Sequence, residues 1–267
     1  MAYTIISLLA SLYVVGWYYT WWGNGLIYSG IHVVAAQVNA WQVAVGLLLL
    51  SVSAATTLAE ERDRGSLDVI MATPLETRDI VWGKWWGTFA TVPRLAILPI
   101  WVAAGAAMVA DGGIGLVLMI GLILAYAAAI TSLGLAVATW VPRLGRVVTV
   151  CVMAYVLVAI GWPIAMQVLP GLPAFRAMPF HEQPNWDGLS FASPFFGIYA
   201  TTEWASRPWF FSYNYLGLGS GPPLAREDPT WPLIWIGVYS AISLFLAIAT
   251  LRTFDRCLGR VPESRRA

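Results

Sequence analysis

Two adjacent glutamates, Glu60 and Glu61, are the residues whose type and spacing most suggest catalysis, because paired carboxylates can move protons to and from water. Intramembrane proteases that use such a pair also need an arginine four positions after the second glutamate. That position holds Gly65, and neither histidine lies at the required spacing within a span. Cys151 and Cys257 lie about a hundred residues apart and form neither a disulfide framework nor a metal site. The sequence therefore predicts a protein that is not an enzyme.

The sequence also predicts that this chain does not bind or hydrolyse a nucleotide. No G-x-x-x-x-G-K-[ST] motif occurs, so no P-loop is present to bind ATP, and we expect no cofactor in this chain. The formal net charge is only +1 and no polybasic groove is present, which argues against a nucleic-acid partner. By contrast, 59% of the residues are hydrophobic, 15 are tryptophan and the mean hydropathy is +0.70, as in an integral membrane protein.

Charged side chains concentrate between residues 60 and 84, in the run E-E-R-D-R-G-S-L-D-V-I-M-A-T-P-L-E-T-R-D-I-V-W-G-K. The chain as a whole is only 11% charged, and this run lies between two long apolar stretches. Charged groups are costly inside a bilayer, so this segment must remain in water while its neighbours enter the membrane.

Within the charged segment, Leu67, Ile70 and Met71 recur at the spacing of one helix face. This spacing predicts a short amphipathic helix from about Ser66 to Thr73. Such a helix between two membrane spans would suit the docking of a cytoplasmic partner, although a solvated loop with one helical turn fits the same residues. Pro74 then interrupts the helix or starts a new one.

Two restarts of the helix are compatible with the sequence. In one, Thr73 is the N-cap, Pro74 is the first helical residue and Glu76 closes a capping box. In the other, Thr77 is the N-cap and the helix begins at Arg78. Both alternatives predict a helix that continues into the next apolar stretch.

The order E-R-x-x-G-S-L, T-P-L and R-D-I-V-x-G-K within this segment resembles the cytoplasmic loop of ABC type-2 permeases, the membrane subunits of many ABC exporters. The resemblance covers about 25 residues of the chain. The residues in register with the family pattern are Glu61, Arg62, Gly65, Ser66, Leu67, Asp68, Pro74, Asp79, Ile80, Gly83 and Lys84.

The resemblance implies that this loop forms a coupling helix, which contacts a separate ABC ATPase subunit that binds ATP and Mg²⁺. On this interpretation the apolar face of the helix fits a groove of the ATPase, and Glu61 and Arg62 lie at the rim. A second permease copy or a paralogue would complete the transporter. The residues expected to take part in coupling are Glu61, Arg62, Gly65, Leu67, Ile70, Met71, Pro74 and Lys84.

The hydropathy pattern predicts an all-α membrane protein, a single permease domain of residues 1–267 with six transmembrane helices. About 20 apolar residues suffice to cross a bilayer as a helix. The predicted spans are residues 2–22, 38–59, 84–110, 114–141, 146–169 and 231–251. Residues 125–138 of the fourth span are rich in small side chains, which predicts a span packed inside the bundle.

A long outer loop, residues 170–230, separates the last two predicted spans and is rich in proline, glycine and aromatic residues. Within it, Ser193 before Pro194 predicts the start of a short helix from Phe195 to about Ala205. Its aromatic side chains suit the outer headgroup layer.

Three polar residues lie within or at the ends of predicted spans and are candidates for a translocation path. Asn39 and Gln42 occur near the outer end of the second span, where an interfacial position is the alternative. Arg94 lies ten residues after Lys84, or roughly 15 Å of helix, about half-way through a ~30 Å hydrocarbon core. It is expected either to snorkel to the headgroups or to face the path or a second copy.

The distribution of basic residues predicts the orientation. Eleven Lys and Arg residues fall on the side of the charged segment and the C-terminal tail, against three in the long loop. By the positive-inside rule, both termini and residues 60–84 are cytoplasmic, and the protein spans the cytoplasmic (inner) membrane. Family members usually open with a cytoplasmic amphipathic helix, whereas here a span begins at the first residue, which leaves open a longer or split permease.

The predicted function is the permease subunit of an ABC transporter, an exporter driven by ATP that a separate subunit hydrolyses. A non-transporting membrane partner of an ATPase, with a mechanical or assembly role, would share the same loop and stays open as an alternative. The substrate cannot be read from these residues.

Overall fold

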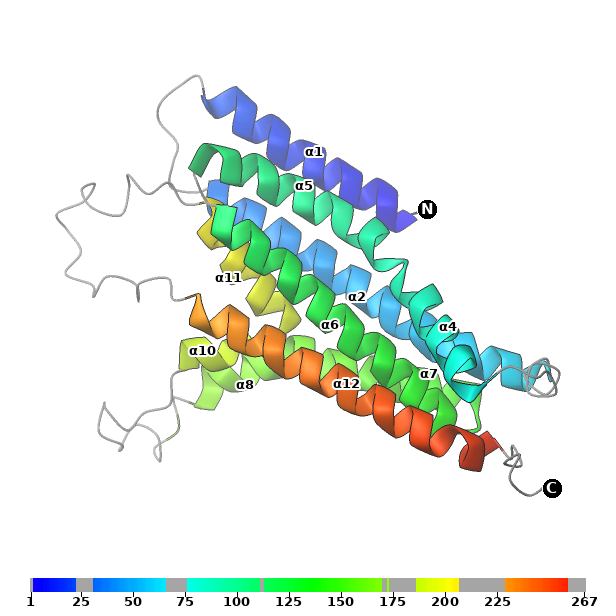
Figure 1. The fold of residues 1–267 in the computed structure, drawn as a ribbon. Helices are drawn as coiled ribbons and strands as arrows, with labels where there is room; N and C mark the ends of the chain where they lie inside the picture. The colour runs from blue at the N-terminus through cyan, green and yellow to red at the C-terminus, as the bar shows by residue number, and fades with distance from the viewer. Residues whose placement is uncertain are drawn as a thin grey trace, which may run out of the picture. The chain divides into compact units, whose positions relative to one another are not determined.

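The computed structural model describes residues 2–22, 31–65, 76–110, 113–169, 172, 186–206 and 229–258, and within them every regular element is helical (Figure 1). The helices are α1 (Ala2–Trp22), α2 (Ile31–Asp63), α4 (Thr77–Phe89), α5 (Val92–Ala110), α6 (Gly113–Trp140), α7 (Leu144–Val156), the π-helical η1 (Leu157–Gly161), α8 (Trp162–Val168), α10 (Trp186–Ser190), α11 (Pro194–Ser206) and α12 (Thr230–Leu258).

Five helical stretches of the described residues are long and apolar enough to cross a membrane: Val33–Asp63, Thr77–Gly105, Gly113–Trp140, Leu144–Val168 and Thr230–Cys257. They correspond to the second to sixth predicted spans. In α1 the apolar stretch is Tyr3–Val14, which is shorter than the 18 residues of a full candidate, so the first span stays a prediction.

The third predicted span differs from the structure at its start and in its continuity. Its helix begins at Thr77, seven residues before the predicted boundary at Lys84, and ends at Phe89. Pro93 has no N–H to donate to the carbonyl of Phe89, so the helical hydrogen bonding is interrupted there. The chain makes a turn at residues 90–91, and α5 then begins at Val92.

Two compact units make up the chain, and most long helices contribute to both. The first unit comprises Met1–Gly46, Leu95–Ile123 and Val158–Ile236, and the second comprises Leu47–Arg94, Leu124–Leu157 and Gly237–Ala267.

In the first unit, prolines within two spans leave helix carbonyls without their usual N–H donor. Pro99 in α5 cannot donate to the carbonyl of Leu95, and the hydroxyl of Tyr3, 3.5 Å from that oxygen, has its shorter hydrogen bond, 3.0 Å, to Gln42 O. Pro163 likewise has no N–H for the carbonyl of Ala159, which accepts a 2.9 Å hydrogen bond from Ser193 Oγ. Such a substitute donor allows Pro163 to remain inside an apolar helix.

The predicted helix in the long loop is present in the first unit as α11. Ser193 caps it as predicted: its Oγ accepts a hydrogen bond from the Phe196 N–H at 3.4 Å. Ile198, Thr201 and Thr202 of α11 are fully buried. The helix is therefore packed within its unit along one face, which the sequence-based expectation of a headgroup layer did not include.

In the second unit, the small residues of α6 allow the close packing that the sequence predicts. A Cβ atom added at Gly134 would lie 2.5 Å from Ala54 Cβ and 2.8 Å from the Ala54 carbonyl carbon in α2. Ala127, Ala136 and Ala138 of α6 are completely buried. Only backbones without intervening side chains can approach so closely, so the packing of α6 against α2 depends on these small residues.

Polar side chains add hydrogen bonds between helices of the second unit. Trp85 of α4 donates its indole N–H to Ser132 Oγ of α6 at 2.9 Å, and Ser132 in turn lies 2.9 Å from Ser243 Oγ of α12. Trp140 donates to Thr253 Oγ1, again from α6 to α12, at 2.9 Å. Unpaired polar groups are costly in an apolar interior, so these contacts fix which helix faces meet.

Candidate functional site

The candidate coupling site is built from residues at the two ends of the charged segment, and all of its described members belong to the second unit. The segment leaves α2 through a turn at Arg64 and Gly65. Gly65 has φ of 72°, a left-handed conformation that glycine adopts without steric cost, and its N–H donates to Arg62 O at 3.1 Å. Gly65 therefore ends α2 and turns the chain into the segment.

Arg62, one of the predicted coupling residues, points into the protein. Its guanidinium donates two hydrogen bonds, to Thr139 O at 3.1 Å and to Val141 O at 3.0 Å. These carbonyls lie at the C-terminus of α6, where the last helical carbonyls have no intrahelical donors and carry partial negative charge. Arg62 thus ties the end of α2 to the end of α6.

Glu61 and Lys84 form an ion pair that joins α2 to α4. The exposed fractions of their side chains are 27% and 26%, so the pair is largely shielded from water. The sequence-based expectation placed Glu61 and Arg62 at the rim of a docking surface. In the structure their charged groups make contacts between helices of the chain itself, and their place at a docking surface stays a prediction.

The start of α4 is tied to α12. Thr77 is the first residue of α4, and its Oγ1 donates to Asp255 Oδ1 at 2.6 Å. Glu76 precedes the helix in extended conformation and makes no side-chain cap hydrogen bond. The alternative in which Thr77 caps a helix that begins at Arg78 is therefore wrong, because Thr77 is already helical and its hydroxyl bonds to another helix. The other alternative depends on Thr73 and Pro74, which lie outside the described residues.

An apolar cluster lies among the same helices. Ile80 and Val81 of α4, Leu58 of α2 and Phe254 of α12 are all buried, with Val147 of α7 completely so. Burial of each such side chain contributes about 1.5 to 3 kcal/mol. Apolar packing therefore supports the hydrogen bonds and the ion pair described above, and together they hold both ends of the charged segment in place.

Four predicted coupling residues, Leu67, Ile70, Met71 and Pro74, lie outside the described residues, as does the predicted helix from Ser66 to Thr73. Their docking role stays a prediction.

The candidate path residues Asn39 and Gln42 lie in the first unit and are buried, with 0% and 6% of their surfaces exposed. Asn39 Nδ2 donates to Pro99 O at 3.1 Å and lies 3.4 Å from Thr202 Oγ1. Gln42 Nε2 donates to Ser7 O at 3.0 Å. Both amides therefore connect helices, and their role in a translocation path stays a prediction. Their carbonyl oxygens, Oδ1 and Oε1, accept no hydrogen bond from the described part of the chain.

Arg94, the third candidate, is exposed near the start of α5. No described residue forms a hydrogen bond or an ion pair with it. All three alternatives of the sequence-based prediction for Arg94, snorkelling, the path and a second copy, stay predictions.

Sequence reasoning missed Thr77, Asp255 and the C-terminal carbonyls of α6 as partners of the segment. Asp255 had one usable signal, because it is an acidic residue in the last turn of an otherwise apolar span. The backbone carbonyls that bind Arg62 could not be identified from the sequence, because every residue type has a backbone carbonyl.

The described helices thus define a multi-pass, all-helical membrane protein with a polar segment tied at both ends. The sequence model of the ABC-2 family transporter proteins matches residues 30–252, which include the charged segment and all five candidate spans except the last residues of α12. No curated protein matches the chain. The chain belongs to the ABC-2 transporter family and is an ABC transporter permease, a transmembrane component.

Proposed function

We propose that this permease is the membrane subunit of an ABC exporter and couples to a separate ATPase through residues 60–84. The observation that carries the proposal is the set of ties at both ends of that segment: Arg62 to the end of α6, Glu61 to Lys84, and Thr77 to Asp255. A solvated loop without a partner would need no such anchoring, whereas a segment that transmits force must be attached firmly to the spans.

The transport mechanism follows from these attachments. An ATPase that binds the apolar face of Leu67, Ile70 and Met71 moves the segment during its nucleotide cycle. Because the segment is tied to α6 and α12, its movement displaces the cytoplasmic ends of these helices. ATP and Mg²⁺ are bound by the ATPase, and this chain supplies the membrane path together with a second permease copy or a paralogue.

The proposed topology has six spans, with α1 as the first and with both termini in the cytoplasm of an inner-membrane protein. It is supported by the basic residues that gather beside the charged segment and in the tail. Residues 1–267 then form a single permease domain.

Co-purification tests this proposal. The tagged full-length chain, expressed with the ABC ATPase encoded next to it, should retain that ATPase in detergent and show nucleotide-dependent activity in liposomes. Purification without any ATPase, and no nucleotide-dependent activity after the ATPase is added back, would contradict the proposal. ATPase activity that responds to another protein and never to a transported substrate would favour the mechanical role.

A further inference from the structure

Asn39 of α2 is completely buried in the first unit, and its side-chain amide uses only its donors. The two N–H groups of Asn39 Nδ2 have two acceptors, Pro99 O of α5 at 3.1 Å and Thr202 Oγ1 of α11 at 3.4 Å. The amide oxygen, Oδ1, accepts no hydrogen bond from any described residue. Asn39 therefore joins three helices through its nitrogen while its acceptor stays unused.

Gln42, about one turn further along α2, repeats this pattern toward α1. It is 6% exposed, and its Nε2 donates to Ser7 O and to Ser11 Oγ, both at 3.0 Å. Its Oε1 likewise accepts nothing from the described residues. The unused acceptor is therefore a property of this stretch of α2 and not of one side chain.

The orientation of the Asn39 amide is fixed by its partners. Pro99 O is a backbone carbonyl, which only accepts hydrogen bonds, so the amide atom that faces it must be the nitrogen. Thr202 supports the same orientation, because its hydroxyl accepts from Nδ2 and itself has Met119 Sδ of α6 as an acceptor at 3.2 Å. A rotated amide would bring the acceptor oxygens of Asn39 and Pro99 together. Rotation of the amide therefore does not satisfy Oδ1.

An unused acceptor in such a buried position is unusual. Polar groups are costly in an apolar interior, and the great majority of buried ones in native proteins are paired with protein atoms or with ordered water. Buried hydroxyls of the second unit follow this rule: Ser132 Oγ pairs with Ser243 Oγ, and Thr139 Oγ1 donates to Leu135 O. Asn39 Oδ1 therefore requires a donor that the described helices do not supply.

The surroundings of Asn39 limit this donor to a small, uncharged molecule. The hydrogen-bond partners of the amide are a backbone carbonyl and a hydroxyl, so a cation would lack a counter-charge and would be costly there. Ala35 and Ala36, which lie one turn before Asn39 on α2, are buried alanines. Because alanine extends only to Cβ, that turn places no long side chain beside the amide. Water is small, uncharged and a hydrogen-bond donor, and it suits such a site.

We propose that Asn39 Oδ1 binds an ordered water molecule between α2, α5 and α11. The water donates the hydrogen bond that the amide oxygen lacks, and Thr202 Oγ1 is the second polar group of the site. It completes the hydrogen bonding of the side chain that joins these three helices beside Pro99, where α5 lacks a backbone N–H. The site lies within the first unit and does not depend on the proposed ATPase partner.

X-ray radiolysis footprinting of the full-length chain in detergent tests this site. X-rays split water, whether bulk or bound, into hydroxyl radicals that oxidise adjacent side chains, and mass spectrometry measures the oxidation rate of each residue. Met119 is the reporter, because it is completely buried and its Sδ lies 3.2 Å from Thr202 Oγ1. Cys151 is the dry reference, because it is 1% exposed within an apolar cluster. Met119 should be oxidised faster than Cys151.

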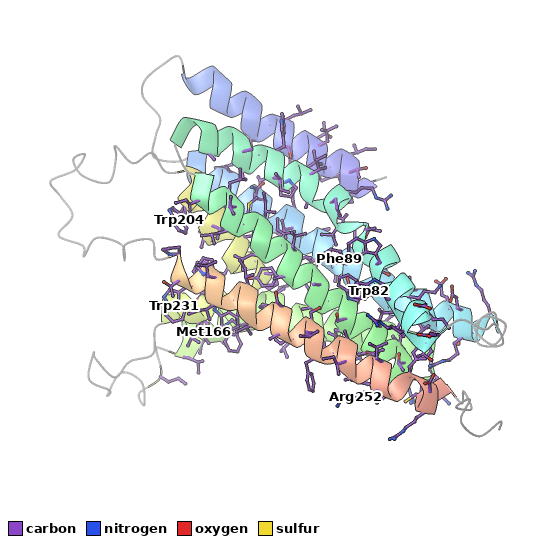
Figure 2. The ribbon with its side chains drawn as sticks, in the orientation of Figure 1. Trp82, Phe89, Met166, Trp204, Trp231 and Arg252 are labelled. Atoms are coloured by element: carbon purple, nitrogen blue, oxygen red, sulfur yellow. The ribbon has the colours of Figure 1, made fainter. Side chains whose placement is uncertain are left out.

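Replacement of the amide by an apolar side chain of similar size tests the role of Asn39. In Asn39→Leu the oxidation rate of Met119 should fall to that of Cys151, because the water loses its acceptor. Met166 of α8, a buried methionine of the same unit that Figure 2 labels, should keep its rate and serves as the internal standard for radical dose. Only the monodisperse fraction from size-exclusion chromatography is compared.

Thr201→Val is the matched control variant. Thr201 is fully buried in α11 beside Thr202, and its hydroxyl donates to Gly197 O of its own helix at 2.7 Å. The substitution therefore removes a buried hydroxyl that is already paired, and it should leave the oxidation rate of Met119 unchanged.

Three results would overturn the proposal. Oxidation of Met119 no faster than that of Cys151 in the unaltered chain, a comparison that needs no variant to fold, would show that the site is dry. Oxidation of Met119 that persists in Asn39→Leu, or that Thr201→Val removes equally, would show that the amide does not hold the water. Oxidation of Met119 by dilute peroxide without X-rays would show that bulk solvent reaches this position.

Discussion

At the scale of single residues, the charged side chains of this permease act mainly on the chain itself. Arg62 satisfies two carbonyls at the end of α6, and Glu61 pairs with Lys84 in a largely shielded position. By contrast, the pair between Glu60 and Arg64 is exposed, and such surface pairs contribute little. The same short run of sequence thus contains both structural charges and solvated ones.

The pair of Glu61 and Lys84 makes a quantitative prediction. Glu61→Gln or Lys84→Gln alone should lower the free energy of unfolding by about 1 to 3 kcal/mol, because each leaves a shielded charge without its partner. The exchanged variant Glu61→Lys with Lys84→Glu should recover a large part of that loss. Unfolding in detergent, analysed as a double-mutant cycle, measures the coupling between the two residues.

The exposed pair is the matched control for this cycle. Removal of both charges, in Glu60→Gln with Arg64→Gln, should change the free energy of unfolding by less than about 0.5 kcal/mol. Equal effects of the two pairs would mean that the shielding of Glu61 and Lys84 has no energetic consequence.

At the scale of elements, hydropathy predicted where most of the apolar helices lie but not where they break. Pro93 ends α4, whereas Pro99 and Pro163 remain inside spans, and Ser193 supplies a hydroxyl to the Ala159 carbonyl that Pro163 leaves free. Each proline was visible in the sequence. Whether a proline ends a helix or remains inside it depends on partners that are distant in the sequence. The spacing of residues does not reveal those partners.

The contacts of the candidate coupling site were foreseen only in part, for the same reason. The family pattern identified Glu61, Arg62 and Lys84, but contacts such as Thr77 to Asp255 join residues 178 positions apart. The burial of Asn39 and Gln42 likewise follows from three helices meeting around them. A polar residue at the end of an apolar run looks the same in sequence whether it faces headgroups or a neighbouring helix.

The packing of α6 against α2 predicts a marked sensitivity at one glycine. Gly134→Ala should lower the free energy of unfolding by about 1 to 3 kcal/mol, because the added Cβ would clash with the backbone of Ala54 and force the helices apart. Thermal unfolding of the purified protein measures this. Gly237→Ala in α12 of the same unit meets nothing within 4 Å and should be neutral or slightly stabilising. A neutral Gly134→Ala would contradict the close approach.

At the scale of the whole molecule, the proposed function depends on orientation, and α12 alone can report it. Cys257 is exposed near the end of this helix, whereas Cys151 is buried. The proposed topology places Cys257 in the cytoplasm. An impermeant thiol reagent added to intact cells should therefore not label the unaltered chain, and it should label Cys257 after the cells are permeabilised.

A cysteine at the other end of α12 provides the complementary measurement. Thr230→Cys, in a chain with Cys257→Ser, places a thiol on exposed surface at the first residue of the helix and should be labelled in intact cells. Gly188 is a poor labelling position, because a Cβ there would lie 2.4 Å from the ring of Trp231. Labelling of Cys257 but not of Thr230→Cys from outside would reverse the topology and move the charged segment away from any cytoplasmic ATPase.

The most direct test of coupling through residues 60–84 is retention of the ATPase by a folded variant of the segment. Leu67→Ser with Ile70→Ser should leave insertion and thermal unfolding nearly unchanged, because neither residue lies in a span, and should abolish pull-down of the ATPase or uncouple ATP hydrolysis from transport. Glu60→Gln with Arg64→Gln, the exposed pair at the start of the segment, should retain the ATPase. Undiminished ATPase binding and coupled transport by the folded Leu67→Ser, Ile70→Ser variant would contradict the account.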